Sequence, residues 1–246
     1  MTRPPHTPRG VFITGTDTGV GKTIVTATVV TALKTQGIDA GVMKPIVTGL
    51  PASGSGGADP QWLLSISGVR DTLDAVSPYR FHIPAAPLVA AAHAGAPIDL
   101  NRIVNALSVL AARHECVIVE GIGGVLVPVT PDLFVVDLIK QLEVPTLVVA
   151  RSGLGSINHT LLTLECLRSR GVRILGLVFN NPMPPTEDTQ VHETIPTILR
   201  VSGVRSFGHL PYCEGLPATW NQHRETLITR LDVQGLLEAL GLRRLA

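Results

Sequence analysis

The sequence predicts an α/β fold, in which one mostly parallel β-sheet is flanked by helices on both faces. Short apolar runs recur along the chain, and a longer helical stretch lies between or after most of them. Most of these runs are apolar throughout, as strands covered on both faces must be. Alternation of strand and helix is typical of βαβ units with right-handed crossovers.

The expected elements follow from composition and length. Runs of four to eight residues rich in Val, Ile and Leu predict strands, whereas longer stretches that mix apolar and polar residues predict helices. The expected strands are VFIT (11–14), DAGVMK (39–44), CVIVE (116–120), PTLVVA (145–150), RILGLVFN (173–180) and RSFGHLP (205–211). The expected helices are 22–37, 61–67, 100–114, 156–170 and 189–201.

Composition bounds the class of protein. The chain has 246 residues, of which 45% are hydrophobic and 16% charged, as in a globular protein with a sizeable core. The net charge is +1, and the sequence has no basic stripe or acidic tail, so we expect no nucleic-acid or membrane partner. Without a repeat or a composition break, we expect one domain over 10–246, preceded by a flexible tail over 1–9.

The cellular location is predicted from three further features. The three cysteines are far apart and form no CxxC pair, which is typical of a reducing compartment. The first ten residues have no apolar segment of the secretory type. No apolar run reaches membrane-spanning length. We therefore expect a cytoplasmic protein.

A phosphate-binding loop is predicted at GTDTGVGKT (15–23), which leaves a strand and opens a helix. Gly19 and Gly21 let the backbone turn, so that N–H groups and the helix N-terminus face an anion. Lys22 would reach the outer phosphates, and Thr23 would place its hydroxyl on Mg²⁺. Five residues separate Gly15 from Gly21, one more than in the common pattern.

Two carboxylates are candidates for the metal, because Mg²⁺ prefers oxygen ligands. Glu120 ends the run CVIVE and precedes glycines, which is typical of a second acidic motif, although a strand-end carboxylate can simply face water. Asp59 precedes Pro60 and a helical stretch. The local sequence favours an N-cap at Asp59, and both roles can coexist.

Lys44 ends a buried strand and is followed by Pro45. A lysine there is costly unless an anion is near, although its long side chain can also extend to solvent. Since parallel strands end at one edge of the sheet, we expect Lys44 and Lys22 to converge from adjacent strand tips on one anionic centre. A nucleotide alone needs one such lysine, and a second one suggests an additional anion beside the γ-phosphate.

Several motifs occur in a characteristic order: GTDTGVGKT, KPIVTG, EGIGG, LGSINHT, FNN and LPY. Together they resemble the dethiobiotin synthetase family, ATP-dependent cyclo-ligases of biotin synthesis with a P-loop NTPase-like fold. The resemblance covers about residues 11–218, and the longer glycine spacing of the loop is the form that this family shows. KPxxTG and LGxINH make the match specific.

The resemblance implies a role for each matching residue. Lys44 acts at the reacting centre with help from Lys22, and Thr23, Asp59 and Glu120 surround Mg²⁺. Asn180 reads the adenine edge. ATP-binding residues are Gly19, Val20, Gly21, Lys22, Thr23, Ile24, Asp59, Glu120, Gly121, Ile122, Gly123, Asn180, Asn181, Pro211, Tyr212 and Cys213. Substrate residues are Thr48, Gly155, Ser156, Ile157 and Asn158, the last four contributed by the other subunit of a homodimer.

The implied reaction joins 7,8-diaminopelargonate, CO₂ and ATP into dethiobiotin, ADP and phosphate, through a carbamate and a carbamic–phosphoric anhydride. A site of lysines, glycines and Mg²⁺ suits this chemistry, because the protein mainly has to align groups and neutralise charge.

Three other readings are compatible with the phosphate loop. A switch ATPase of the partitioning type usually has a lysine near the start of the loop, where this chain has Thr16-Asp17-Thr18. An amide-forming ATPase of a related kind needs a second domain, for which 246 residues leave little room. A plain nucleotide-binding module would leave two converging lysines without a purpose.

Overall fold

The computed structural model describes residues 9–51, 60–184 and 191–243. Within them, six strands form one sheet in the order β2-β5-β1-β6-β7-β8, and every pairing is parallel. The strands are β1 (Gly10–Gly15), β2 (Ala40–Met43), β5 (Cys116–Gly124), β6 (Thr146–Ala150), β7 (Ile174–Asn180) and β8 (Ser206–Leu210). The predicted parallel sheet is confirmed. Of the expected N-terminal tail, residues 1–8 lie outside the described residues.

Ten helices are described: α1 (Lys22–Thr35), α2 (Pro60–Ser67), α3 (Leu73–Val76), α4 (Pro87–Ala94), α5 (Leu100–Ala111), α6 (Val135–Leu142), α7 (Ser156–Ser169), α8 (Val191–Ser202), α9 (Trp220–Ile228) and α10 (Val233–Leu240). The sequence predicted α1, α2, α5, α7 and α8. It missed α3, α4, α6, α9 and α10, which have four to nine residues each. Such short segments show too few turns for a helical period to stand out.

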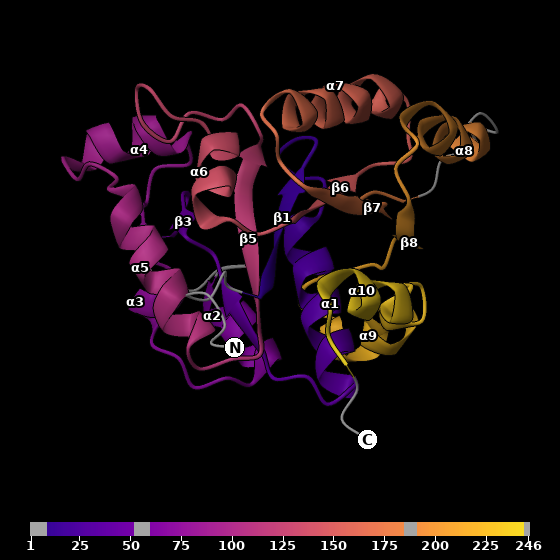
Figure 1. Ribbon diagram of the computed structural model, residues 1–246, viewed down its shortest axis with the longest axis horizontal. Helices are drawn as coiled ribbons and strands as arrows, with labels where there is room; N and C mark the ends of the chain where they lie inside the picture. Colours follow the sequence, from indigo (N-terminus) through magenta and orange to yellow (C-terminus); the bar gives the residue numbers. More distant parts are fainter. Residues whose placement is uncertain (1–8, 52–59, 185–190, 244–246) are drawn as a thin grey trace, which may run out of the picture.

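Helices cover both faces of the sheet, as predicted. Figure 1 shows α1, α9 and α10 together on one side, and α6 and α7 on the other. A second, two-stranded sheet pairs β3 (Ile46–Val47) with β4 (Tyr79–Arg80) in parallel, just beyond the end of β2. The sequence did not predict this small sheet, because two-residue strands carry no pattern of their own.

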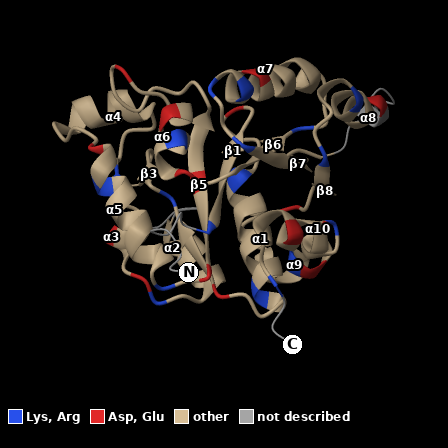
Figure 2. Ribbon diagram, in the orientation of Figure 1, with Lys and Arg blue, Asp and Glu red and all other residues tan. Residues whose placement is uncertain are grey.

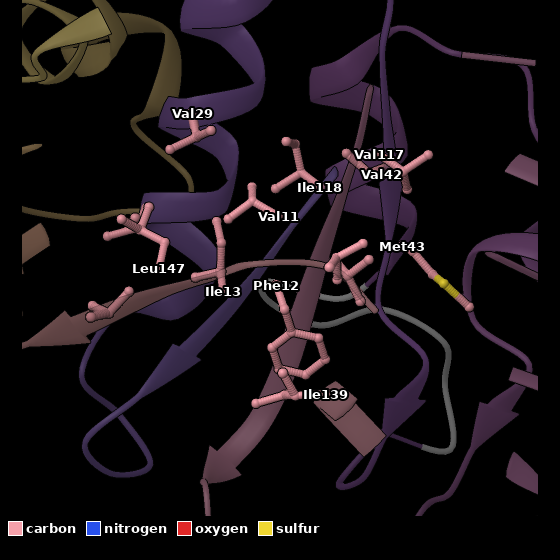
Figure 3. Close-up of a cluster of buried hydrophobic side chains, with 14 of the residues drawn as sticks. Val11, Phe12, Ile13, Val29, Val42, Met43, Val117, Ile118, Ile139 and Leu147 are labelled. Atoms are coloured by element: carbon pink, nitrogen blue, oxygen red, sulfur yellow. The ribbon is translucent and has the colours of Figure 1, made fainter. Parts of the chain in front are cut away.

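The core lies on both sides of the central strands. Figure 3 shows side chains of β1, β2 and β5 packed with Val29 of α1 on one side and Ile139 of α6 near Phe12. These residues are buried, and Phe12, Val42 and Ile118 are fully inaccessible to solvent. Burying β-branched and aromatic side chains on both faces is what holds a parallel sheet between helical layers.

The helices differ in how their first turns are capped. Asp99 caps α5 and Asp232 caps α10, each by accepting a backbone N–H with its carboxylate. The N-cap of α1 is Gly21, which has no side chain to offer. Backbone N–H groups in the first turn of α1 are therefore left for an external acceptor, which is the arrangement of an anion site.

Charged residues are distributed over the whole fold. Figure 2 shows basic and acidic positions interspersed on the helices and loops rather than gathered in one band on the coloured part of the chain. Among the described residues, no helix combines the length and hydropathy that crossing a membrane requires.

Candidate active site

The phosphate loop lies where the sequence predicted it, between β1 and α1. Gly19 and Gly21 both have a positive φ, of 73° and 91°, which glycine adopts without steric cost. Lys22 is the first residue of α1 and is only 8% exposed. Its Nζ donates to the backbone oxygen of Asp17, 2.9 Å away, so the lysine folds back over its own loop.

Glu120 lies on β5, between β1, which leads into the loop that ends at Lys22, and β2, which is followed by Lys44. The register pairs Met43 with Val119, which brings Lys44 beside Glu120 as β2 ends. On the other side, Ile13 of β1 pairs with Glu120. We expected the two lysines at adjacent strand tips, and that expectation is wrong, because β5 lies between β1 and β2. The consequence is that the strand carrying Glu120 separates the strand before the phosphate loop from the strand before Lys44.

One oxygen of Glu120 accepts two partners. Lys44 Nζ lies 2.9 Å from Oε1, and Thr23 Oγ1 donates to the same atom at 2.7 Å. Glu120 is 1% exposed, and its Oε2 is buried with no hydrogen-bond partner among the described residues. A buried carboxylate oxygen without a donor is costly. The donor set of Thr23 and Glu120 therefore fits a hard cation such as Mg²⁺.

The pKa of Lys22 is lowered by burial and is also affected by the neighbouring charges. The pKa is lowered from 10.5 to about 8, and burial is the largest cause. The positive charge of Lys44 lowers this pKa further, whereas the negative charges of Glu120 and Asp17 raise it. The buried Lys22 and the partly buried Lys44 repel each other, so that binding a polyanion beside them would be favourable.

A cavity of about 340 Å³ opens in front of these residues. It brings together most of the predicted phosphate and metal residues with Thr48, and its lining is Thr18, Gly19, Gly21, Lys22, Thr23, Ile24, Lys44, Val47, Thr48, Glu120, Gly121, Ile122, Gly123, Leu216 and Pro217. The sequence missed Thr18, Val47, Leu216 and Pro217. Thr18 and Val47 lie inside motifs that were recognised, and Leu216 and Pro217 closely follow LPY, so position relative to the motifs could have found them.

The residues expected on the base side lie at the ends of β7 and β8. Asn180 is the last residue of β7 and is paired with Leu210, the last residue of β8. Asn181 Oδ1 accepts a hydrogen bond from Ser152 Oγ. Pro211, Tyr212 and Cys213 follow β8 and are partly exposed. None of these five base-side residues lines the 340 Å³ cavity.

The four residues expected to meet substrate from a second subunit begin α7. Gly155 is its N-cap, with φ 81° and no side-chain capping bond, and Ser156 is buried. Asn158 is exposed and Ile157 is 36% exposed. This group does not line the cavity of the phosphate loop in the single chain. The neighbouring Leu154 is 93% exposed.

Asp59, the third expected metal ligand, lies outside the described residues. Over 9–51, 60–184 and 191–243, no group of three or more His, Cys, Asp or Glu side chains is arranged to hold a metal ion. Of the three expected metal ligands, the described residues therefore include Thr23 and Glu120, which are hydrogen-bonded to each other.

Comparison with known proteins decides the family. A family model described as "AAA domain" matches residues 9–219. The chain is 44% identical to the ATP-dependent dethiobiotin synthetase of Anaeromyxobacter dehalogenans over 204 residues, which are 83% of this chain and 90% of that protein.

The chain belongs to the ATP-dependent dethiobiotin synthetase family.

Other members of this family are similar over as much of the chain. The dethiobiotin synthetase of Bacillus licheniformis is 41% identical, covering 87% of this chain and 91% of its own. That of Thermodesulfovibrio yellowstonii is 36% identical, covering 93% and 98%. The motifs that suggested the family therefore belong to a similarity that spans most of the chain.

Solved structures share the fold of this chain. The cell division protein MinD of Aquifex aeolicus superposes with a TM-score of 0.59 at 14% identity, covering 96% of this chain and 99% of its own. A ParA family ATPase from Chlorobium tepidum has a TM-score of 0.51 at 18% identity, covering 94% and 93%. At such identities these likenesses bear on the fold alone.

Proposed function

We propose that this chain is an ATP- and Mg²⁺-dependent dethiobiotin synthetase that closes the ureido ring of dethiobiotin from 7,8-diaminopelargonate and CO₂. Membership of the family supports the reaction. One observation assigns the reaction to particular residues: Lys44 and Thr23 both contact Glu120, in the cavity that Lys22 also lines. The loop residues Gly19–Ile24 and the glycines after Glu120 would bind the phosphate chain of ATP.

Thr23 and Glu120 would hold Mg²⁺, with Asp59 as a third ligand by family resemblance. The buried, unpartnered Oε2 of Glu120 supports this assignment, because a cation would satisfy it. Bound Mg²⁺ supplies charge neutralisation on the phosphate oxygens and helps to hold them in place. The base would lie near Asn180, Asn181 and the turn Pro211–Cys213.

The two lysines carry the reacting centre in this proposal. An amine of the substrate adds to CO₂ with loss of a proton, giving a carbamate anion. Lys44 and Lys22 stabilise that anion, and a carbamate oxygen attacks the γ-phosphorus while ADP leaves. The second amine then attacks the carbamoyl carbon of the anhydride, closes the ring and expels phosphate. The protein's contribution is alignment and electrostatic stabilisation, which the two lysines would supply.

A homodimer completes the substrate site in this proposal. The uncapped N-terminus of α7, at Gly155–Asn158, is suited to a carboxylate, because a helix N-terminus binds anions through backbone N–H groups. Those residues lie away from the phosphate cavity of their own chain, which fits a role toward the partner's substrate. Thr48, which does line the cavity, would contact the substrate near its amines. The enzyme would work in the cytoplasm.

The test is release of ADP with diaminopelargonate and bicarbonate, compared with ATP alone. The proposal expects ADP release to require the diamine and dethiobiotin to appear in equal amount. Lys44→Gln is expected to abolish most turnover while ATP still binds. Near-full turnover of Lys44→Gln would remove Lys44 from the reacting centre. ADP release without the diamine would favour a switch ATPase instead.

A further inference from the structure

Asn180 makes a buried contact with the phosphate loop itself. Its Nδ2 donates to the backbone oxygen of Val20 at 2.9 Å, although the two residues are 160 positions apart in the sequence. Asn180 is 4% exposed. The orientation of the amide follows from chemistry, because a backbone oxygen only accepts and therefore faces the nitrogen of the side chain. Asn180 is thus tied to the loop before any ligand is considered.

The same amide packs against Gly21. A Cβ placed on Gly21 would overlap Asn180 Nδ2 and stand 3.0 Å from Asn180 Cγ. Gly21 also has a φ of 91°, which residues with a side chain rarely adopt. Val20 and Gly21 are the last two residues before α1, so the asparagine holds the part of the loop that sets the first turn of the helix.

Holding the Val20 oxygen on the β7 side has a consequence for phosphate binding. A backbone oxygen that turned into the phosphate cradle would repel the anion, whereas one bonded to Asn180 is kept out of it. The first turn of α1 has no side-chain cap, so its N–H groups depend on the loop for their direction. A fixed loop binds a polyanion more tightly than one that must be ordered first.

We propose that Asn180 is a positioning residue for the phosphate loop, in addition to any contact with the adenine base. The inference rests on the proposed use of ATP. Asn180 contributes to binding of the phosphate chain through Val20 and Gly21, and it does so also for polyphosphates that carry no base. Its chemistry is that of a buried amide donor, which neither alanine nor aspartate can reproduce at neutral pH.

The experiment compares two ligands that differ in the base. Binding of Mg·ATP and Mg·tripolyphosphate is measured by titration calorimetry at pH 7.5 for the wild type, Asn180→Ala and Asn180→Asp. Aspartate keeps the shape of asparagine and replaces the donor with an oxygen that faces the Val20 oxygen. Both variants are expected to weaken tripolyphosphate by about tenfold or more, as the loss of a buried donor implies. The matched control is Tyr212→Ala, on the base side, which is expected to weaken ATP and leave tripolyphosphate unchanged.

The outcomes separate this inference from the proposed function. If both Asn180 variants lost affinity for ATP but bound tripolyphosphate as tightly as the wild type, the positioning role would be overturned. The proposed function would not be affected by that result. Failure of the wild type to bind Mg·ATP would overturn the proposed function itself. Circular dichroism and urea unfolding establish that each variant is folded.

A measurement on the wild type does not depend on the variants. A side-chain amide proton that donates to a buried backbone oxygen exchanges slowly with solvent. The Asn180 NH₂ resonances in a ¹⁵N spectrum are therefore expected to include one proton that is protected in the ligand-free protein. Fast exchange of both protons would contradict the proposal.

Discussion

Replacing Lys44 by methionine is expected to destabilise the ligand-free protein, although Lys44 is proposed to act in catalysis. Methionine keeps the alkyl part of the side chain and removes its charge. Glu120 then loses the cation that lies 2.9 Å from its Oε1, while its side chain is only 2% exposed. Thr23 remains as a donor to Oε1, and Oε2 has no hydrogen-bond partner among the described residues.

The size of the effect follows from this geometry. At 2.9 Å and an effective dielectric constant of about 20, the attraction is about 6 kcal/mol, part of which is offset by desolvation. Removing one partner of a buried pair usually costs about 3–5 kcal/mol, and we expect that range for Lys44→Met. Lys44→Gln is the matched control, because its amide can still donate to Glu120 and recover about 1 kcal/mol.

Urea unfolding in the absence of metal and nucleotide measures these free energies, with fluorescence of Trp62 and Trp220 as the signal. Glu120→Gln in the Lys44→Met background removes the buried charge and is expected to restore about 2 kcal/mol. The reasoning is refuted if Lys44→Met costs less than about 1 kcal/mol and the double variant is no more stable than the single one.

Three further predictions concern the same site. Since the pKa of Lys22 is lowered to about 8 from 10.5, wild-type Lys22 carries an unfavourable buried charge below pH 8. The stability of the wild type relative to Lys22→Met should therefore rise between pH 8 and 10.5, where only the unfolded chain keeps the proton. If the urea midpoints of the wild type and of Lys22→Met changed by equal amounts between pH 7, 9 and 10, this prediction would be contradicted. Glu120→Gln should weaken Mg²⁺ binding in the presence of ADP by about tenfold or more, since a carboxylate ligand is lost; an unchanged calorimetric titration would remove Glu120 from the metal site. Gly21→Ala should weaken ATP more than Gly19→Ala, because both glycines have a positive φ but only at Gly21 would the new Cβ overlap another side chain; equal losses in a binding titration would refute the steric argument.

Much of the site could be predicted because local sequence patterns identify its residues. The phosphate loop follows an apolar strand and opens a helix, and Lys44 comes directly after β2. Glu120 was expected to end its strand, and that expectation is wrong, because β5 continues through the following glycines to Gly124. Because parallel strands end at one edge, Lys44 and Lys22 were expected at the same edge of the sheet. The direct contact between Lys44 and Glu120 was not predicted. The roles assigned to Asn180, Tyr212 and the start of α7 remain predictions.

The sequence by itself determined the α/β class and the phosphate loop, and it singled out Lys44 and Glu120, since short apolar runs, glycine spacing and single polar residues are local patterns. Only the tertiary structure decided that β5 lies between β1 and β2, that Lys44 contacts Glu120, and that Asn180 donates a hydrogen bond to Val20. Strand order and such contacts depend on the packing of long crossover connections against the sheet. This packing involves segments that are far apart in the chain, so that no local sequence pattern indicates it.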